Sequence, residues 1–194
     1  MIDLSDYFTQ QDDILKNKLG ITSPEKMKKL EAEVVPLRMA EILANPPRGK
    51  MDFAYLKQIH FSLFHDLYYI AGQVRTVDIA KGDSVFCYSQ NIESQQVQIF
   101  SHFNSNPQPG DLTAEALSRQ LSWLSSELNA LHPFREGNGR AIRTFLILFS
   151  LRCGFHIDYS QIAQASLLEA DIRAFQGDLS SLNHLYYDHL TPID

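Results

Sequence analysis

The helical spacing of apolar residues is the feature that most restricts the fold of this chain. Between Thr113 and Leu131, leucines recur at steps of four, three, four and three, on Leu117, Leu121, Leu124, Leu128 and Leu131. That spacing places them on one face of a helix. Residues 139–153 are apolar nearly all round, which predicts a helix buried on every side. Two such helices joined by a short connection favour an all-α protein with a buried central helix.

Further segments carry the same signals. Ser23-Pro24 predicts a helix start, because serine caps the first turn and proline suits its first position. Pro36 should kink or split that helix. A second helix is expected over residues 52–71, closed by Gly72 in the left-handed region. Two shorter helices are expected near residues 159–175 and 179–190.

One stretch departs from the helical pattern. Val74–Ile79 and Val85–Tyr88 are β-prone and flank a turn that contains Gly82-Asp83, which predicts a hairpin. A lone hairpin is marginal in water, so its free edge suggests pairing with a strand of another molecule.

Composition limits the remaining choices. A chain of 194 residues predicts one domain, residues 1–194, and its net charge of −6 argues against direct binding of nucleic acid. Cys87 and Cys153 are too few for a disulfide framework or a zinc site. The polar N-terminus does not resemble a signal peptide, and no apolar run is long enough to span a membrane. We therefore expect a soluble, cytoplasmic protein.

The segment from His132 to Arg143 concentrates residues suited to phosphate chemistry. Gly137-Asn138-Gly139 lets the backbone turn closely around a ligand and leaves amides at a helix N-terminus, where an anion is favoured. Arg140 and Arg143 would crowd positive charge against the helix dipole unless a polyanion binds there.

Three other residues complete this site. Glu136, the single carboxylate of the loop, is suited to hold Mg²⁺ beside phosphates. His132 suits a general base, and Phe134 should point inward and anchor the loop. Each residue alone has an ordinary structural interpretation, as a cap, a turn or a solvated face. Together, beside a helix with no polar face, they favour a catalytic site.

The pattern His132-x-Phe134-x-Glu136-Gly137-Asn138-Gly139-Arg140-x-x-Arg143 resembles the signature of the Fic family at every position. Residues 60–75 resemble the family's helix that leads into a hairpin, and residues 81–86 resemble its flap. The resemblance implies a compact, helical Fic-like domain with a flap near residues 74–88 and a catalytic loop at residues 132–140.

The resemblance also implies an activity, the transfer of AMP from ATP to a Ser, Thr or Tyr hydroxyl of a target protein, with release of pyrophosphate. His132 would deprotonate the hydroxyl, and Glu136 would hold Mg²⁺. The α-phosphoryl group would bind at Gly137, Asn138 and Gly139. The β- and γ-phosphates would bind to Arg140 and Arg143.

Within the flap, the resemblance implies two groups of residues. Those that dock the target strand would be Val77, Asp78, Ile79 and Phe86. Those that line the nucleotide pocket would be Lys81, Gly82, Asp83 and Ser84.

Several alternatives stay open. Doc-like proteins resemble this family but phosphorylate their targets, and their altered anion loop lacks the equivalent of Gly139. Transfer of UMP or phosphocholine would use the same motif. A non-catalytic protein-binding module belongs to another class of function, but it would not require His132 and Glu136 together.

Control is a separate question. Many Fic proteins contain an inhibitory helix with the motif Ser/Thr-x-x-x-Glu-Gly/Asn, and the complete motif is absent from this sequence. Ser62-x-x-x-Asp66-Leu67 only imitates it, within a helix patterned for the core. The resemblance thus implies a possible toxin whose inhibitor is an antitoxin-like partner that carries the motif.

Overall fold

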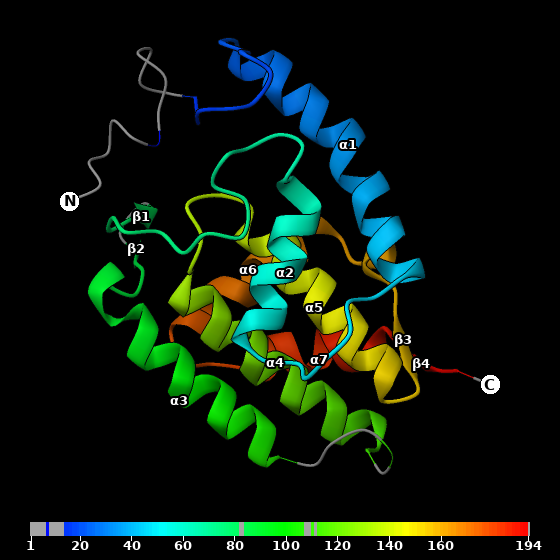
Figure 1. Ribbon diagram of the computed structural model, residues 1–194. Helices are drawn as coiled ribbons and strands as arrows, with labels where there is room; N and C mark the ends of the chain where they lie inside the picture. Colours follow the sequence, from blue (N-terminus) through cyan, green and yellow to red (C-terminus); the bar gives the residue numbers. More distant parts are fainter. Residues whose placement is uncertain (1–6, 8–13, 82–83, 107–109, 111, 194) are drawn as a thin grey trace.

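The computed structural model describes Tyr7 and residues 14–81, 84–106, 110 and 112–193. Within these residues the fold is mainly helical, which confirms the predicted class (Figure 1). The helices are α1 Pro24–Ala44, α2 Phe53–Phe64, α3 Ile92–Ser105, α4 Ala114–Leu131, α5 Asn138–Arg152, α6 Gln164–Phe175 and α7 Ser180–Asp188. Short 3₁₀ turns follow the flap at Ser89–Asn91, called η2, and precede α6 at Tyr159–Gln161.

Helix α5 lies at the centre of the molecule, between α2 and α4 (Figure 1). Its Phe145 is fully buried and meets the edges of the Tyr55, Phe100 and Phe103 rings, which belong to α2 and α3. Burial of each large apolar side chain contributes about 1.5–3 kcal/mol. The N-terminus of α5 adjoins the predicted catalytic loop, residues 132–140, so a largely buried helix supports that loop.

Helix starts follow the capping residues of the sequence. The side chains of Ser23, Asp52 and Thr113 accept hydrogen bonds from Lys26, Tyr55 and Ala116 amides. These caps satisfy amides that would otherwise lack a partner. The predicted starts of α1, α2 and α4 are confirmed.

Pro36 does not split the first helix, because α1 continues to Ala44. Proline removes one hydrogen bond, but Val35 and Ile42 on either side of it are buried, and Arg38 pairs with Asp66 at 2.5 Å. Tertiary contacts therefore hold the helix through its weak point. The predicted split was wrong.

The predicted extension of the second helix to residue 71 was also wrong, since α2 ends at Phe64. Residues 65–72 form turns instead, and the N-terminal segment bonds to them: Lys18 N–H donates to the Leu67 carbonyl at 2.9 Å. Gly72 has φ +74, as expected, but a Cβ there would lie 2.9 Å from Phe61 Cβ. Both this close approach and the turn therefore require glycine at position 72.

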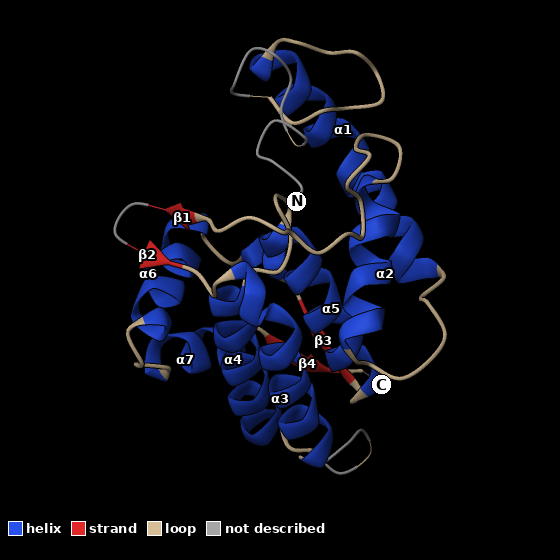
Figure 2. Cartoon of the chain, turned by 60° about the vertical axis from the view of Figure 1, so that its left-hand side comes forward, coloured by secondary structure: helices blue, strands red, loops and turns tan. Residues whose placement is uncertain are grey.

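The structure contains elements that the sequence patterns did not predict. One is α3, whose buried side chains are only Ile92, Ile99, Phe100 and Phe103. Another is an antiparallel pair of short strands, β3 Phe155–Ile157 and β4 Leu190–Pro192, which Figure 2 shows in red near the C-terminus. None of the helices in the described ranges is both long enough and apolar enough to cross a membrane.

The predicted hairpin is present but smaller than expected. Strand β1, Ala80–Lys81, pairs with β2, Ser84–Val85, in antiparallel register. The prediction of a strand over residues 74–79 was wrong. The backbone there bonds to the catalytic loop instead, as when Arg75 N–H donates to the Pro133 carbonyl at 2.9 Å. On the returning leg, Cys87 N–H donates to the Ala130 carbonyl at 2.9 Å, so the flap base is attached to the end of α4.

Candidate active site

His132 terminates α4 in a constrained geometry. It has φ +43 and ψ +60, the left-handed region, and is the only non-glycine residue with positive φ in the described part of the chain. Its Nδ1 lies 3.2 Å from the Asn129 carbonyl oxygen, which assigns the proton to Nδ1 and leaves Nε2 as an acceptor. One ring face stacks on Phe86 of the flap at 3.9 Å. The imidazole is therefore oriented before any substrate binds.

The electrostatic surroundings keep this imidazole neutral. Burial lowers the pKa of His132 to about 4, and the positive charges of Arg75 and Lys81 act in the same direction, against the hydrogen bond to Asn129. At neutral pH the ring can thus accept a proton, as the predicted base requires.

Arg75 fixes the backbone that carries His132. The guanidinium is fully buried and donates to the carbonyl oxygens of His132 and Val77, both at 2.7 Å, and of Leu131 at 3.3 Å. It also donates to the Cys87 carbonyl. Burial lowers the pKa of Arg75, yet arginine stays charged in proteins. One cation therefore joins both legs of the flap to the end of α4.

Phe134 anchors the loop as predicted, because its ring is fully buried and stacks on His60 at 3.9 Å. His60 accepts a hydrogen bond from the Gly72 amide at Nδ1, so its Nε2–H donates to the Glu136 carbonyl at 2.9 Å. Burial lowers the pKa of His60 to about 4. A neutral, buried histidine thus connects Gly72, which precedes the flap, with Glu136 of the catalytic loop.

The Asn138 side chain shapes the catalytic loop. Its side chain is buried, accepts from the Phe134 amide at 2.9 Å and donates to the Phe134 carbonyl at 2.8 Å. Both functional groups of the amide are occupied, so the side chain shapes the loop. Only its backbone N–H, in the first turn of α5, is available for an anion.

Gly137 precedes α5 at φ +79, and a Cβ there would lie 2.5 Å from the Phe64 ring. No other residue fits without displacing that ring. Gly139 is in the first turn, and the Arg143 guanidinium folds back over it, since a Cβ at Gly139 would be 3.4 Å from Arg143 Nη1. The helix N-terminus and Arg143 are thus adjacent, as the predicted phosphate site requires.

The two arginines of the motif have different neighbours. Arg140 Nη1 pairs with Glu31 of α1 at 2.5 Å, while its guanidinium lies over the Phe64 ring at 4.7 Å. Arg143 interacts with Asp171 of α6, a largely buried carboxyl whose pKa is raised to about 6 by desolvation. Both arginine side chains are partly exposed.

Glu136, the single carboxylate of the loop, is exposed, with 57% of its side chain accessible. Its Oε1 accepts from the Gly137 amide at 3.0 Å and lies 3.7 Å from Arg140 Nη2. No cluster of three acidic, His or Cys side chains that could hold a metal occurs in the described residues. A single carboxylate still fits Mg²⁺ bound together with phosphate oxygens and water.

The flap residues predicted to dock a target strand differ in their contacts. Asp78 accepts a hydrogen bond from the Ser89 amide at 2.7 Å, so its carboxylate holds η2. This bond lowers the pKa of Asp78. Phe86 lies against His132, and the Ile79 carbonyl accepts from the Phe86 amide at 3.3 Å. Val77 is tied to Arg75 through its carbonyl.

Of the four residues predicted to line the nucleotide pocket, the structure describes Lys81 and Ser84. Lys81 is exposed and close enough to His132 to influence its pKa. Ser84 lies in β2, opposite Lys81. Gly82 and Asp83 lie outside the described residues.

Helix α6 adds residues that the sequence analysis missed. Leu168, Ile172 and Phe175 are 54%, 52% and 38% exposed, although they share one apolar face. The inward face carries the small residues Ala170 and Ala174 instead. Large apolar residues on one face of this helix, opposite a face with alanines, were the sequence signal that could have indicated an exposed apolar surface.

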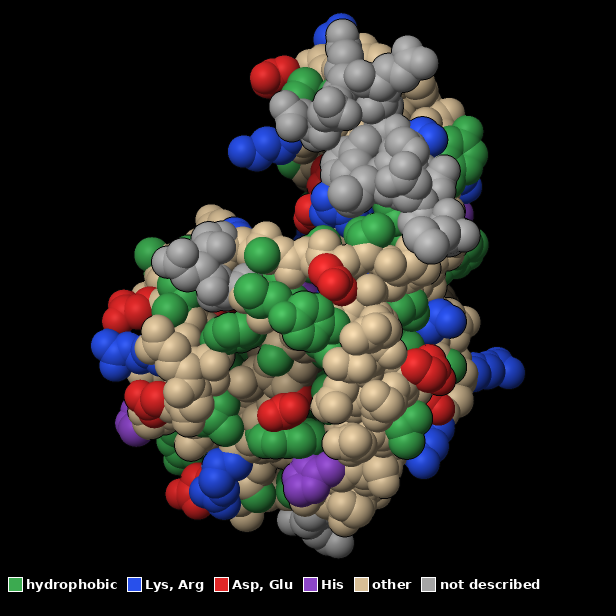
Figure 3. Space-filling model, turned by 90° about the vertical axis from the view of Figure 1, so that its left-hand side faces the viewer, with side chains coloured by type: hydrophobic (Ala, Val, Ile, Leu, Met, Phe, Trp, Pro, Cys, Tyr) green, Lys and Arg blue, Asp and Glu red, His purple; other side chains and the backbone are tan. Residues whose placement is uncertain are grey.

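Phe175 meets Phe86 edge to face at 6.1 Å, so the exposed face of α6 adjoins the flap. A groove of about 380 Å³ runs beside this contact, between the returning leg of the flap, α3 and α4, and includes Val85, Phe86, Tyr88 and Phe175 in its lining. Figure 3 shows apolar side chains gathered on this face of the molecule.

The chain resembles known enzymes along most of its length. A family model described as the Fic/DOC family matches residues 50–150. Protein adenylyltransferase VbhT of Bartonella schoenbuchensis is 33% identical over 185 residues, which cover 95% of this chain but 39% of VbhT. The probable protein adenylyltransferase y4lH of Sinorhizobium fredii is 34% identical over 170 residues, 87% of each protein.

Solved structures agree with this assignment. BepC of Bartonella tribocorum, with bound AMPPNP, superimposes with a TM-score of 0.91 at 26% identity, over 97% of both chains. The Fic domain of a putative cell filamentation protein from Bartonella quintana, with bound ADP, gives 0.87 at 27% identity, over 97% of this chain and 95% of that one. The family match and the similarity to y4lH lead to one conclusion: the chain belongs to the Fic/DOC family.

Proposed function

We infer that this chain is a protein adenylyltransferase that transfers AMP from ATP to a hydroxyl side chain of another protein. The observation that carries this inference is the placement of a neutral, oriented histidine six residues before the first residue of α5, a helix with two arginines near its N-terminus. The names of VbhT and y4lH and the AMPPNP bound to BepC support the same reaction.

In the reaction, His132 Nε2 takes the proton of the target hydroxyl as its oxygen attacks the α-phosphorus. An oxygen–phosphorus bond forms, and the bond between the α-phosphorus and the α,β-bridging oxygen breaks. Pyrophosphate leaves with that electron pair. The Asn129 carbonyl, which holds Nδ1–H at 3.2 Å, stabilises the imidazolium that results.

The phosphates are bound by α5. Backbone amides in its first turn receive the α-phosphoryl oxygens, and Arg140 and Arg143 bind the β- and γ-phosphates. Glu136 would hold Mg²⁺ beside the phosphates, and the cation would supply positive charge that offsets the developing negative charge. Positioning and charge stabilisation therefore account for most of the catalysis.

The two exposed surfaces beside His132 have separate tasks. The apolar face of α6, with Leu168, Ile172 and Phe175, offers a platform for the nucleotide base. The flap, with β2 as a free edge, receives a strand of the target protein, so that its hydroxyl reaches His132.

Incubation with ATP labelled on the α-phosphate, together with proteins of the host, tests this function. Label on protein that disappears in the His132→Ala variant supports AMP transfer, because loss of a general base costs about 10²–10⁴-fold. Label from the γ-phosphate alone would indicate a Doc-like kinase. Absence of both, with ATP still bound, would favour a non-catalytic module.

We also propose a small inhibitory partner whose helix carries Ser/Thr-x-x-x-Glu. Arg143 is partly exposed and makes no salt bridge within the described residues, so a partner's glutamate can pair with it and exclude the γ-phosphate. Ser89 and Glu93 of this chain have the motif's spacing, but Ser94 follows, and Glu93 accepts from Gln96 at 3.3 Å in the first turn of α3.

Co-expression tests this second proposal. The chain alone should slow growth and label host proteins, and the partner should reverse both effects. Replacement of the partner's glutamate by glycine should restore labelling while the complex persists. If removal of terminal residues from this chain activates an otherwise inert enzyme, the inhibition is internal and the proposal is wrong.

A further inference from the structure

Glu31 of α1 reaches the catalytic segment from a distant part of the sequence. Its Oε2 accepts from Arg140 Nη1 at 2.5 Å, across 109 residues. Its Oε1 accepts from the Tyr68 hydroxyl, and burial together with this bond raises the pKa of Tyr68. Only 16% of the Glu31 side chain is exposed. Both carboxylate oxygens are thus occupied, and the group is held in one orientation.

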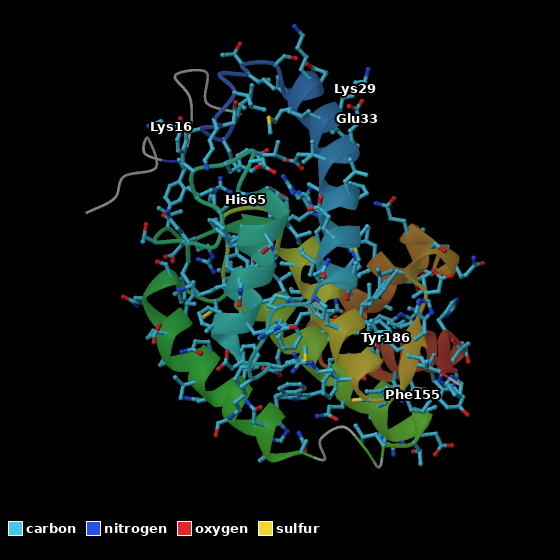
Figure 4. The ribbon with its side chains drawn as sticks, turned by 45° about the vertical axis from the view of Figure 1, so that its right-hand side comes forward. Lys16, Lys29, Glu33, His65, Phe155 and Tyr186 are labelled. Carbon is cyan, nitrogen blue, oxygen red and sulfur yellow. The ribbon has the colours of Figure 1, made fainter. Side chains whose placement is uncertain are left out.

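The charged neighbours of Glu31 on α1 face solvent. Lys29 and Glu33, which flank Glu31 in sequence, are exposed and project away from the body of the molecule (Figure 4). Glu31 instead lines a cavity of about 200 Å³ between the start of α1 and the catalytic loop, together with Tyr68 and Glu136. Glu33 therefore provides a matched control on the same helix.

Arg140 is constrained from several sides. Glu31 holds Nη1, the Phe64 ring lies 4.7 Å from the guanidinium carbon, and Glu136 Oε1 is 3.7 Å from Nη2. A guanidinium has five N–H donors, of which the bond to Glu31 uses one. The remaining donors can bind phosphate while Glu31 keeps the planar group in place.

We propose that Glu31 is a positioning residue for nucleotide binding, which acts by holding Arg140 in the orientation that meets the phosphates. This inference rests on the proposed function, in which Arg140 binds the β- and γ-phosphates. Release of Arg140 would leave the largely buried Glu31 carboxylate without its cation, which is costly. Glu31 therefore stays bound to Arg140 when the triphosphate binds, instead of competing with it.

Calorimetric binding of ATP, ADP and AMP to the full chain tests the proposal. Glu31→Ala should weaken ATP and ADP binding by roughly 10- to 100-fold, the usual cost of losing a group that orients a ligand. AMP binding should stay unchanged, because AMP lacks the phosphates that Arg140 contacts. Glu31→Gln, which keeps the side-chain volume, should show an intermediate loss, and Glu33→Ala should show none.

A double-mutant cycle separates this role from a structural one. If Glu31 acts only through Arg140, Glu31→Ala should cause no further loss of ATP binding in an Arg140→Ala background. A loss of AMP binding with both Glu31 variants, or additive effects in the cycle, would show a merely structural role and overturn the proposal. Tighter ATP binding by Glu31→Gln would also overturn it, because Glu31 would then withhold Arg140 from phosphate.

The same variants distinguish a failure of the proposed function from a failure of the inference about Glu31. If Arg140→Ala binds ATP as the wild type does, the role of Arg140 in the proposed function is wrong. If Arg140→Ala weakens ATP binding and neither Glu31 variant does, only the inference about Glu31 is wrong. Thermal unfolding of Glu31→Gln identifies any loss that comes from the fold.

Discussion

Arg75 holds the peptide of His132 directly: a guanidinium N–H donates to the His132 carbonyl oxygen at 2.7 Å from a site that excludes water. The same group bonds to both legs of the flap. The position of the base and the position of the flap are thus set by one side chain. The planar fork of arginine is needed because its donors point in several fixed directions.

Arg75→Lys should therefore destabilise the protein and reduce transfer, although the charge is kept. Lysine has three donors on one atom and cannot span the carbonyl groups of His132, Val77 and Cys87. Unpaired buried carbonyls cost about 1–3 kcal/mol each, so the free energy of unfolding should fall by at least about 2 kcal/mol. Urea unfolding measures this fall. A variant as stable and active as the wild type would show that the arginine fork is dispensable.

Gly137→Ala should disturb the catalytic loop by collision rather than by backbone strain alone. The new Cβ would lie 2.5 Å from the Phe64 ring, at φ +79. Gly154 has a similar φ of +81 but open space around it, so Gly154→Ala is the matched control for left-handed strain. We expect weaker ATP binding and a lower melting temperature for Gly137→Ala than for Gly154→Ala. Equal effects of the two substitutions would contradict the steric argument.

Acid should destabilise the fold through His60. Burial lowers its pKa to about 4 from an unfolded value of 6.5, so the unfolded chain binds the proton first as pH falls. The stabilisation is present above pH 6.5 and is lost as pH falls towards 4, by up to about 3 kcal/mol. Unfolding of the wild type and of His60→Gln, measured between these limits, should show a shallower pH dependence in the variant.

Asp171→Asn should stabilise the protein at alkaline pH. Desolvation raises the pKa of Asp171 from 3.8 to about 6, so the carboxyl favours the folded state below pH 3.8 and loses that contribution as pH rises through 6. The side-chain amide of the variant avoids the cost of a buried charge. Its oxygen can still accept a hydrogen bond from Asn129, whose Nδ2 donates to Asp171 Oδ1 at 3.1 Å in the wild type. The gain over the wild type should grow between pH 4 and 8, to no more than about 3 kcal/mol. A gain independent of pH would rule out this explanation.

Glu136→Ala should remove the effect of Mg²⁺ on nucleotide binding and leave the fold intact. Its side chain is 57% exposed, and substitutions at such positions usually change stability by less than about 0.5 kcal/mol. ATP binding measured with and without Mg²⁺ should differ in the wild type and converge in the variant. A large fall in melting temperature with unchanged Mg²⁺ dependence would identify Glu136 as a structural residue.

The sequence by itself determined the chemistry-bearing segment and most of the helices. Local signals carry that information: Ser23 and Thr113 cap helices, the Leu117–Leu131 ladder marks a buried face, and Gly137 marks a turn beside a phosphate-binding helix end. Each of these depends on residues within a few positions of one another, where spacing along the chain defines spacing in space.

Only the tertiary structure decided which distant residues surround that segment. The pattern around Glu31 marks it as one charged residue among several on α1, and nothing local indicates its bond to Arg140, 109 residues away. Nothing local indicates the bonds of Arg75 either. The strands are shorter than predicted because Arg75 and its neighbours bond to the catalytic loop. Such contacts depend on how separate helices pack, and hydrogen bonds between them form only once the core has brought their backbones together. Local periodicity therefore specifies the elements and the motif, while packing selects the partners that orient them.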